Sequence, residues 1–525
     1  MKKLLFLIGC LLLENAIFAQ RNVILLIADD LGTDYCGFYE NHLDTLNMPN
    51  VRKLLSKGVR FKNAWSNPLC SPTRAGILTG RYSFRTGVGN AVGGATSAVL
   101  DTAEMTIPRM LNLYKPNGFA KANIGKWHLH LLTPTSNYNF PNQMGYDHFE
   151  GNFSGVLNSF TNWSKVTNGK ASNMTNYATT ETVDNAVSWI KKQKQPFFLW
   201  VAFNAPHTPY HLPPLNLHSY QTLSGTAADI TSKPVPYFKA ATEALDREIG
   251  RLFDSLSVLQ KMDSTDIIFM GDNGNDPKVA QNTGGAKGSV YQEGVNVPFI
   301  IAGPSVVNPG RVSDALVNTH DLFATILELF GYANWKQSIA ANRSVDSKSI
   351  LPILKGTSTT IRPWVFTEVF KIPTVAGDGK AMRNESYKLL DFDNGTQKFF
   401  KLSVDPTENK DLLLGTMSTE DQLNYTYLCN EMTNLVGKGG FCVISAIEEK
   451  EILGSSVKVS PNPFSDYIVI HGGRPGDRYL LFDSRGSILF EGNDLEKTSF
   501  RHLPAGHYFL EVVGKKTSML HLIKQ

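Results

Sequence analysis

The sequence predicts an α/β protein: a large, mixed and mostly parallel sheet with helices on both faces, a smaller antiparallel C-terminal subdomain and a terminal β-sandwich. Two observations predict this fold class. Continuously apolar segments of strand length, such as residues 22–28 and 196–203, alternate with helical segments, as in sheets buried on both faces. After about residue 361 the expected strands become short and follow one another closely. The length of 525 residues agrees with one large domain and appendages.

The alternation can be followed along the chain. Expected strands cover residues 22–28, 59–64, 120–124, 196–203, 266–274 and 297–302, and expected helices cover residues 49–58, 180–192, 237–259 and 320–329. Short strands are expected in the subdomain at residues 364–370, 379–383, 387–391 and 398–402, and in the tail at residues 467–471, 478–483 and 507–513. In open α/β sheets, functional groups collect where the strands end.

Composition and charge exclude several classes of protein. The net charge of +4 is too small to indicate a nucleic-acid or membrane-surface partner. Beyond the N-terminus no apolar segment is long enough to span a bilayer. The five cysteines do not make a disulfide framework, and Cys429 and Cys442 could either pair across a short loop or stay free. We therefore expect a globular protein with no nucleic-acid partner and no transmembrane segment.

The first 19 residues have the features of a cleaved signal peptide. Lys2 and Lys3 precede an apolar segment at residues 4–13, and Ala19 provides a small residue for cleavage. Residues 7–10 also resemble a lipoprotein box, but the apolar segment before its cysteine is short for a signal core. Cleavage after Ala19 is the favoured interpretation, and it predicts a secreted or cell-surface protein.

A Cys-x-Pro-x-Arg motif at Cys70, Pro72 and Arg74 precedes an apolar helical segment that ends at Gly80. Proline suits the first turn of a helix, so Cys70 should lie just before a helix N-terminus. There, backbone N–H groups and Arg74 would lower the pKa of the thiol or stabilise an oxyanion in its place. The alternative is a buried structural cysteine before an ordinary helix.

Four further residues could act on an anion. Lys126 and His128 follow the expected strand at 120–124, and residues two apart on a strand project to the same face, where they would offer a cation and a base. His207 lies between two prolines at a strand end, which would hold it in place as a catalytic acid requires. Lys287 lies in a glycine-rich loop. The alternative for each is a surface or structural loop residue.

Oxygen-bearing side chains end two of the apolar strands. Asp29 and Asp30 follow the first strand directly, and Asp272 and Asn273 end the strand at 266–274. Adjacent carboxylates repel each other unless a cation lies between them. Oxygen ligands suit calcium or magnesium, and the lack of ligating histidines or thiolates speaks against zinc. The alternative is a solvated turn in which an aspartate caps a helix, and this would be the simpler interpretation if only one aspartate followed the strand.

In order and spacing these segments resemble the type I sulfatase family, from about Asn22 to about Leu414. The resemblance implies an alkaline-phosphatase-like fold and oxidation of Cys70 by a maturase to Cα-formylglycine. Thr73 stands where serine is usual, which leaves open which maturase acts. The resemblance implies that one metal ion, usually Ca²⁺, is bound by Asp29, Asp30, the modified Cys70, Asp272 and Asn273. It also implies that Arg74 supports the formylglycine and that Lys126 and Lys287 bind the sulfate group. His128 would be a base, and His207 would be the acid that protonates the leaving group.

The reaction implied by the resemblance is hydrolysis of a sulfate ester. Fixed positive groups would neutralise the sulfate oxygens in the transition state, and the hydrated aldehyde at Cys70 would supply the attacking hydroxyl. His128 would then deprotonate the second hydroxyl, which a plain serine does not have. Export favours a sulfated polysaccharide or its oligosaccharides as the substrate. The sugar, the ring position, endo or exo action and the oligomeric state stay open.

Two other functions remain at this point. A phosphatase or phosphodiesterase of the same superfamily would need a second metal site and a serine or threonine nucleophile. A non-catalytic binder of sulfated glycans would keep Lys126 and Lys287 but leave Cys70 unmodified.

The chain divides into five predicted segments: a signal peptide (1–19), a sulfatase catalytic domain (20–360), a C-terminal sulfatase subdomain (361–447), a charged linker (448–455) and a tail (456–525). The tail has a Pro-Asn-Pro sequence at residues 461–463 and resembles the C-terminal sorting domain of type IX secretion substrates. This resemblance implies the type IX secretion machinery as a partner. A small carbohydrate-binding sandwich is the alternative, but about seventy residues without an aromatic platform make a poor lectin.

Overall fold

A computed structural model describes residues 21–39, 42, 44–371, 375, 377–437, 458–472, 474, 476–483, 488–513 and 518–524. The predicted signal peptide, the predicted linker and Cys442 lie outside the described residues; Cys429 is disulfide-bonded. The chain forms two compact units. One consists of residues up to Ala381 together with Phe392–Thr396, and the other of Met382–Asp391 and Gln397–Gln525. The predicted domain boundaries stay predictions.

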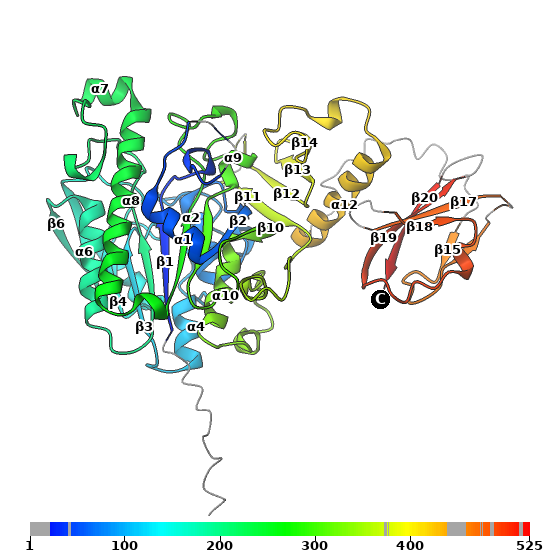
Figure 1. Cartoon of the computed structure of the whole chain (residues 1–525), viewed down its shortest axis with the longest axis horizontal. Helices are drawn as coiled ribbons and strands as arrows, with labels where there is room; N and C mark the ends of the chain where they lie inside the picture. Colours follow the sequence, from blue (N-terminus) through cyan, green and yellow to red (C-terminus); the bar gives the residue numbers. More distant parts are fainter. Residues whose placement is uncertain are drawn as a thin grey trace, which may run out of the picture. The chain divides into compact units, whose positions relative to one another are not determined.

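Among the described residues of the first unit, a ten-stranded mixed sheet has the order β10-β2-β9-β8-β1-β7-β3-β4-β5-β6 (Figure 1). Its central strands β8, β1, β7, β3 and β4 are parallel to their neighbours within this group. The strands are β1 (Asn22–Ala28), β2 (Gly58–Trp65), β3 (Ala120–Gly125), β4 (His148–Gly151), β5 (Trp163–Thr167), β6 (Lys170–Met174), β7 (Phe197–Ala202), β8 (Thr265–Gly271), β9 (Phe299–Ala302) and β10 (Arg311–Asn318). The predicted α/β class with a mostly parallel sheet is confirmed.

The sheet lies between two hydrophobic layers. Successive residues of β1 alternate between them: Val23, Leu25 and Ile27 join one cluster, whereas Ile24 and Leu26 join the other. Successive side chains of a strand point to opposite faces of the sheet, so a strand that is buried on both faces contributes to both layers. The first cluster includes α2 (Cys70–Thr79), α4 (Ile107–Tyr114) and α10 (Leu322–Leu329); the second includes α1 (Pro49–Lys57), α6 (Ala178–Lys191) and α8 (Pro234–Val258). Helices therefore cover both faces, as predicted.

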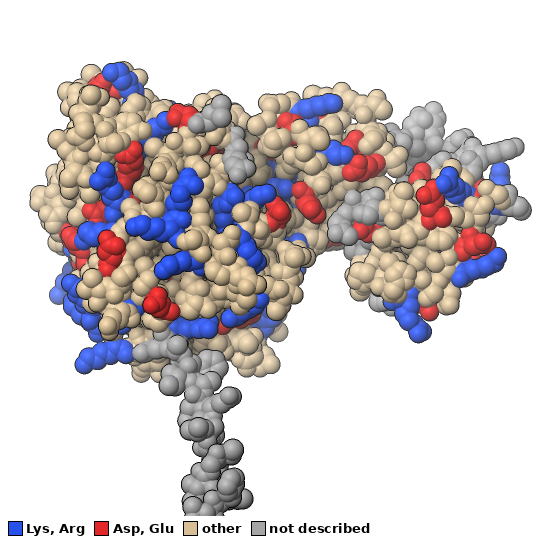
Figure 2. Space-filling view, viewed as in Figure 1, with Lys and Arg blue, Asp and Glu red and all other residues tan. Residues whose placement is uncertain are grey.

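Shorter elements complete the first unit. Its remaining helices are α3 (Ser83–Thr86), α5 (Phe140–Gln143), α7 (Ala227–Ser232), α9 (Gln292–Val295) and α11 (Leu351–Leu354), and it also contains β11 (Val365–Val369) and most of β12 (Gly379–Arg383). None of the helices in the described ranges is long and apolar enough to cross a membrane. Figure 2 shows Lys and Arg side chains spread over one face of this unit with Asp and Glu among them, in keeping with the small net charge.

The second unit is built from antiparallel strands and one long helix. Strands β13 (Tyr387–Phe392) and β14 (Gln397–Lys401) pair in antiparallel register, and α12 (Thr419–Val436) follows. In the tail, β15 (Lys458–Ser460) pairs with β16 (Val469–His471), and a four-stranded sheet has the order β18 (Ile488–Gly492), β17 (Arg478–Asp483), β19 (Gly506–Val513), β20 (Ser518–Lys524). Phe464, Leu481 and Leu510 belong to one hydrophobic cluster that joins these two sheets. The predicted antiparallel C-terminal strands are confirmed.

Candidate active site

The candidate site lies at the carboxyl ends of the central strands. Asp29 and Asp30 follow β1, and Asp272 and Asn273 follow β8, its parallel neighbour. Lys126 follows β3 and the loop with His207 follows β7, the strand that lies between β1 and β3. Cys70 begins α2. The structure therefore brings together, at one edge of one sheet, residues that are widely separated in the sequence.

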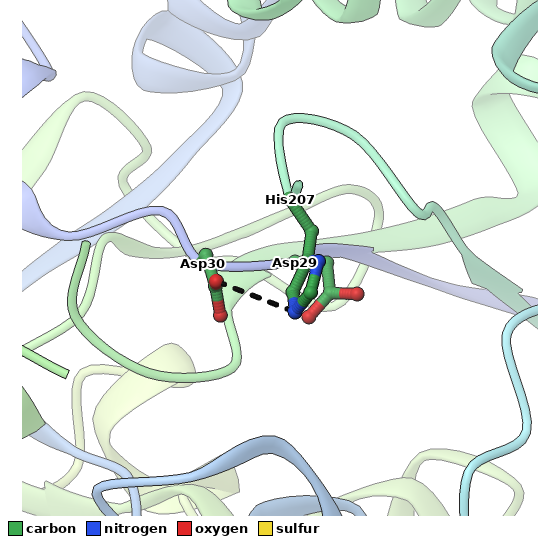
Figure 3. Close-up of side chains that lie close together, drawn as sticks. All are labelled: Asp29, Asp30 and His207. Atoms are coloured by element: carbon green, nitrogen blue, oxygen red, sulfur yellow. Dashed lines mark ion pairs between the residues drawn. The ribbon is translucent and has the colours of Figure 1, made fainter. Parts of the chain in front are cut away.

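Two overlapping groups of these side chains have the spacing of metal ligands. One ligand atom each from Asp29, Cys70 and Asp272 lies within 4.8 Å of the others, and the same holds for Asp29, Asp30 and His207. All five side chains are buried. Figure 3 shows His207 beside the two aspartates, with its ion pair to Asp30 at 3.5 Å between Nε2 and Oδ2. Asp29 is the residue that both groups share.

The oxygen atoms of this cluster fit a hard divalent cation. Oδ1 of Asp29 and Oδ1 of Asn273 are buried without a hydrogen-bond partner among the described residues. The Asn273 amide nitrogen donates to Asp30 Oδ1 at 2.8 Å and to the Gly274 carbonyl at 2.8 Å, which fixes the orientation of the amide. A buried acceptor without a donor is costly, and a bound cation would satisfy both oxygens.

Charges in the cluster are balanced by three cations. Lys126 Nζ donates to Asp29 Oδ2 at 2.5 Å, Arg74 Nη2 to Asp272 Oδ2 at 2.8 Å, and Lys287 Nζ to Asp30 Oδ2 at 2.7 Å. Burial, together with the neighbouring Asp29 charge, raises the pKa of Asp272 to about 7. Burial would also raise the pKa of Asp29, but Lys126, His207 and Arg74 outweigh it and lower that pKa. A bound cation would relieve the repulsion between these two carboxylates.

His128 is placed as a base toward position 70. Its Nδ1 lies 3.1 Å from Cys70 Sγ, and its Nε2 lies 2.7 Å from the Val92 carbonyl oxygen. A carbonyl only accepts hydrogen bonds, so Nε2 carries the proton and Nδ1 presents a lone pair to Cys70. Burial, and then the charges of Lys126 and Arg74, keep the pKa of His128 well below its ordinary value. The imidazole is therefore neutral and able to accept a proton.

Two expectations about Cys70 are wrong. The helix begins at Cys70 itself, after the N-cap residue Leu69. The pKa of the thiol is raised rather than lowered, because complete burial outweighs the charges of Lys126 and Lys287. An unmodified thiol here is a weak nucleophile. The helix terminus lies in the protein interior, and the sequence did not reveal that burial.

The expected placement of Lys126 and His128 on one strand is also wrong. Strand β3 ends at Gly125, which has φ +111°, and a Cβ atom at that position would lie 1.9 Å from the Ala202 carbonyl oxygen. His128 has φ +56°, and Asp30, on the neighbouring part of the site, has φ +60°. Both residues therefore adopt the left-handed region, which is uncommon for residues other than glycine. The two side chains meet the site from a loop.

His207 is oriented by its own loop. Nδ1 lies 2.7 Å from the Thr208 carbonyl oxygen, so the proton is on Nδ1 in the neutral ring and Nε2 faces Asp30. Burial lowers the pKa of His207, with Asp30 and Asp29 opposing this effect. For Lys287, burial is outweighed by the charges of Asp30, Cys70 and Asp29, and its pKa is raised.

Comparison with known proteins decides the family. The sequence profile of the sulfatase family matches residues 21–332, more than half of the 525 residues. The chain belongs to the sulfatase family. A second profile, for the C-terminal part of N-sulphoglucosamine sulphohydrolase, matches residues 286–435. As a sulfatase, the chain is a sulfuric ester hydrolase.

Individual relatives agree with this assignment. N-acetylgalactosamine-6-sulfatase of Canis lupus familiaris is 28% identical over 378 residues, which are 65% of this chain and 67% of the relative. N-acetylgalactosamine-6-O-sulfatase of Bacteroides thetaiotaomicron is 25% identical over 488 residues, which are 76% of this chain and 91% of the relative. The chain thus spans about two thirds of the length of the canine relative and most of the bacterial one.

Solved structures show the same fold. Ps i-CgsB, crystallised in complex with k-i-k-neocarrahexaose, has a TM-score of 0.65 and 25% identity, and the match covers 79% of this chain and 92% of that chain. A protein solved in complex with D-glucosamine-2-N,6-O-disulfate has a TM-score of 0.62 at 20% identity, with coverage of 79% and 98%. The second match supports the fold alone.

Several residues of this sulfatase site were missed by the sequence analysis. Ser71 Oγ donates to the His128 carbonyl at 2.8 Å and accepts from the Val92 N–H at 3.0 Å. The Asn275 side chain accepts from the Gly32 N–H at 3.0 Å, and its carbonyl accepts from the Lys287 N–H at 2.9 Å. Asn275 directly extends the segment 271–274 at the end of β8, which is the only sequence signal that could have found it.

Gly155 is another missed residue, and it predicts a large mutational effect. A Cβ atom at Gly155 would lie 2.2 Å from His128 Nε2 and 2.4 Å from Cε1. The imidazole is held between Cys70 and Val92, so a ring that makes room for the Cβ atom has to leave at least one of these contacts. Gly155→Ala is expected to lower kcat for sulfate release by about a hundredfold, the cost of displacing a reacting group by about 1 Å.

The control for this variant is Gly415→Ala, because a Cβ atom there meets nothing within 4 Å. It should retain kcat within about twofold, in keeping with a surface substitution. Thermal melting of both variants separates misfolding from displacement of His128. A folded Gly155→Ala protein with full activity would mean that the ring position is not needed.

Proposed function

We propose that this sulfatase is a secreted, calcium-dependent enzyme that hydrolyses sulfate esters of glycans by means of a formylglycine formed from Cys70. One observation carries the proposal: ligand atoms of Cys70, Asp29 and Asp272 lie within 4.8 Å of one another, and three cationic side chains, two of them buried, pair with the aspartates around them. A reactive group at position 70 is thereby placed next to both the oxygens that suit a divalent cation and the positive charges that suit an anionic ester.

The proposed substrate class is a sulfated polysaccharide or its oligosaccharides, of glycosaminoglycan-like chemistry. Two relatives are named as sulfatases of N-acetylgalactosamine, and a structural neighbour at 25% identity was crystallised with k-i-k-neocarrahexaose. These names support a sugar sulfate in preference to a small intracellular ester.

The chain's own residues divide the work as follows. The cation and the formylglycine would supply a Lewis acid and a hydroxyl nucleophile. Lys126 and Lys287 lie where they can neutralise the charge that develops on the sulfate oxygens. His128 accepts a proton from the group at position 70 through Nδ1. His207 acts in its doubly protonated form, which the charges of Asp30 and Asp29 favour, and delivers the Nε2 proton to the departing alcohol.

A phosphatase or phosphodiesterase of the same superfamily is less well supported. It would need a second metal site. It would also need a serine or threonine nucleophile, whereas the residue at position 70, beside the ligand groups, is a cysteine. A non-catalytic glycan binder would also have no need for a base such as His128 aimed at Cys70.

Maturation and metal dependence test the proposal. When the chain is produced with a formylglycine-generating maturase, mass spectrometry of the peptide with Cys70 should show the aldehyde, and the protein should release sulfate. Removal of the metal with EGTA should abolish release and lower the melting temperature by a few degrees, because a ligand of the folded state stabilises it. Ca²⁺ should restore both properties better than Mg²⁺. An active preparation that contains only thiol at Cys70 would refute the formylglycine.

Export is the second part of the proposal. It rests on the signal-like residues 1–19 and on the tail, whose described residues have a hydrophobic cluster of their own. Deletion of residues 456–525 is expected to leave sulfate release within about twofold and to retain the protein inside its host's outer membrane. Fractionation of the host with an immunoblot checks the second result. Loss of hydrolysis in a folded, metal-loaded truncated protein would show that the boundary is wrong.

A further inference from the structure

A cavity lies beside the loop that contains Val92, the residue whose carbonyl accepts a hydrogen bond from His128. Its volume is about 280 Å³, near the lower end of ligand pockets, which suits one sugar ring rather than a chain. All of its lining residues belong to the first unit. They are Gly87, Gly89, Asn90, Ala91, Thr96, Ser97, Ala98, Phe370 and Lys371.

The lining of the cavity is continuous in sequence with the residue that contacts His128. Ala91 lines it, and the next residue, Val92, accepts the hydrogen bond from His128 Nε2 at 2.7 Å. The opposite edge of the same imidazole lies 3.1 Å from Cys70 Sγ. The Val92 N–H also donates to Ser71 Oγ at 3.0 Å, so one bond ties this loop to the start of α2 and another ties it to His128. The loop that lines the cavity is therefore in contact with His128 and with Ser71, the residue after Cys70.

The lining has the chemistry of a sugar site. Phe370 is half-buried and lines the cavity; Gly89 packs against one side of its ring, where a Cβ atom would be 2.5 Å from three ring atoms, so only the remaining ring surface can contact a sugar. Ser97 Oγ accepts from the N–H groups of Gly93 and Gly94 at 3.1 Å, which leaves its own hydrogen to donate. Asn90 Oδ1 accepts from the Ala91 N–H at 2.8 Å, so its NH₂ group remains as a donor.

Among the described residues of this lining, Lys371 is the charged one. Its side chain is exposed, and among the described residues it makes no ion pair, whereas its backbone N–H donates to Asp378 Oδ2 at 2.8 Å. None of the described residues that line the cavity is acidic. A single unpaired ammonium beside an aromatic face and hydrogen-bond donors selects a sugar that carries an anionic group.

We propose that this cavity, the Lys371 subsite, binds the sugar next to the sulfated one and recognises a carboxylate or second sulfate on it through Lys371. The inference rests on the proposed function and narrows its substrate class to oligosaccharides with an anionic group on consecutive sugars. Lys371 is a specificity-determining residue in this account, and it takes no part in the chemistry at Cys70.

Binding without turnover tests the subsite. In a Cys70→Ala background, calorimetry would compare three probes: the saturated chondroitin 6-sulfate disaccharide, its carboxyl-reduced counterpart, and the reduced disaccharide with a second sulfate on the neighbouring sugar. Lys371→Ala is expected to weaken binding of the two doubly anionic probes by about fivefold, as for an exposed ion pair, and to leave the reduced probe unchanged. An effect on only one anion identifies which group Lys371 recognises.

Three controls make the result decisive. Lys371→Arg should still bind the two doubly anionic probes more tightly than the reduced probe. Lys170→Ala changes a lysine on the exposed edge strand β6 and should leave the binding of every probe unchanged. Phe370→Ala should weaken all three probes. Equal weakening of all probes by Lys371→Ala, or no weakening of any, would overturn the subsite. Sulfate release from nitrophenyl sulfate by the matured chain is measured in parallel. If sulfate is released but Lys371→Ala does not separate the doubly anionic probes from the reduced probe, only the subsite is refuted. If Lys371→Ala separates the probes but no sulfate is released, only the proposed function is refuted.

Discussion

Replacement of Cys70 with serine is expected to lower steady-state sulfate release by about a thousandfold or more, the scale of losing a nucleophile. Serine has nearly the same size, so Asp29, Asp272 and His128 should keep their places around it. A serine offers one hydroxyl, whereas a hydrated formylglycine offers two, and the second is the one whose proton His128 would take to expel sulfate. The variant should therefore release at most one alcohol per enzyme molecule.

Rapid-quench measurement of alcohol and sulfate separately checks this result. The matched control is Cys36→Ser, since Cys36 is also a buried free cysteine. Its Sγ donates to the Gly32 carbonyl at 3.6 Å, a distance that a serine hydroxyl has to shorten to make a hydrogen bond, so thermal melting of this control is measured as well. This control should retain sulfate release within about threefold. A Cys70→Ser protein that turned over repeatedly would favour the phosphatase-type alternative, in which serine is the nucleophile.

Replacement of His207 with alanine is expected to reduce turnover of a sugar sulfate by at least about a hundredfold, the usual worth of a general acid. A sugar hydroxyl is a poor leaving group and needs a proton as it departs, whereas nitrophenolate leaves unaided. The loss on nitrophenyl sulfate should therefore be about tenfold or less in single-turnover cleavage. Lys287 is the weaker candidate for the acid, because its ion pair with Asp30 raises its pKa and holds the proton on Nζ.

The control for His207 is His148→Ala. His148 is a half-buried histidine on β4 that pairs with Glu150 at 3.1 Å, so its loss should change neither substrate by more than about twofold. Equal losses of His207→Ala on both leaving groups would mean that His207 binds sulfate, and Lys287 would then become the candidate acid. The measurement must follow the first cleavage, since a slow later step would hide the difference.

Strands buried on both faces could be predicted well from the sequence. Every residue of β1 and of β8 is buried, and their continuous apolar character is readable without the fold. The hairpin of β5 and β6 was missed, because four of the five residues of β6 are exposed and show no apolar period. Strand β18 in the tail was also missed, although it begins with the apolar residues Ile488, Leu489 and Phe490.

For the site, the sequence predicted which residues meet but not how they meet. Motif order placed Asp29, Cys70 and Asp272 together, since parallel strands end at one edge. The contact of Gly155 with the His128 ring is invisible in the sequence, because no periodic pattern links a loop glycine to an imidazole 27 positions away. The raised pKa of Cys70 was mispredicted because burial opposes the effect of the helix terminus and depends on the whole fold.

The left-handed backbone of Asp30 and His128 has a consequence for how this enzyme can diversify. Each such conformation costs about 1 kcal/mol outside its structural setting, and here the central strands maintain both. The reacting groups are thus preorganised before any substrate arrives, and little ordering entropy remains to be lost on binding. Substrate preference can then drift through substitutions in the surrounding loops while the chemistry stays fixed, and two sulfatases with the same centre can serve different glycans.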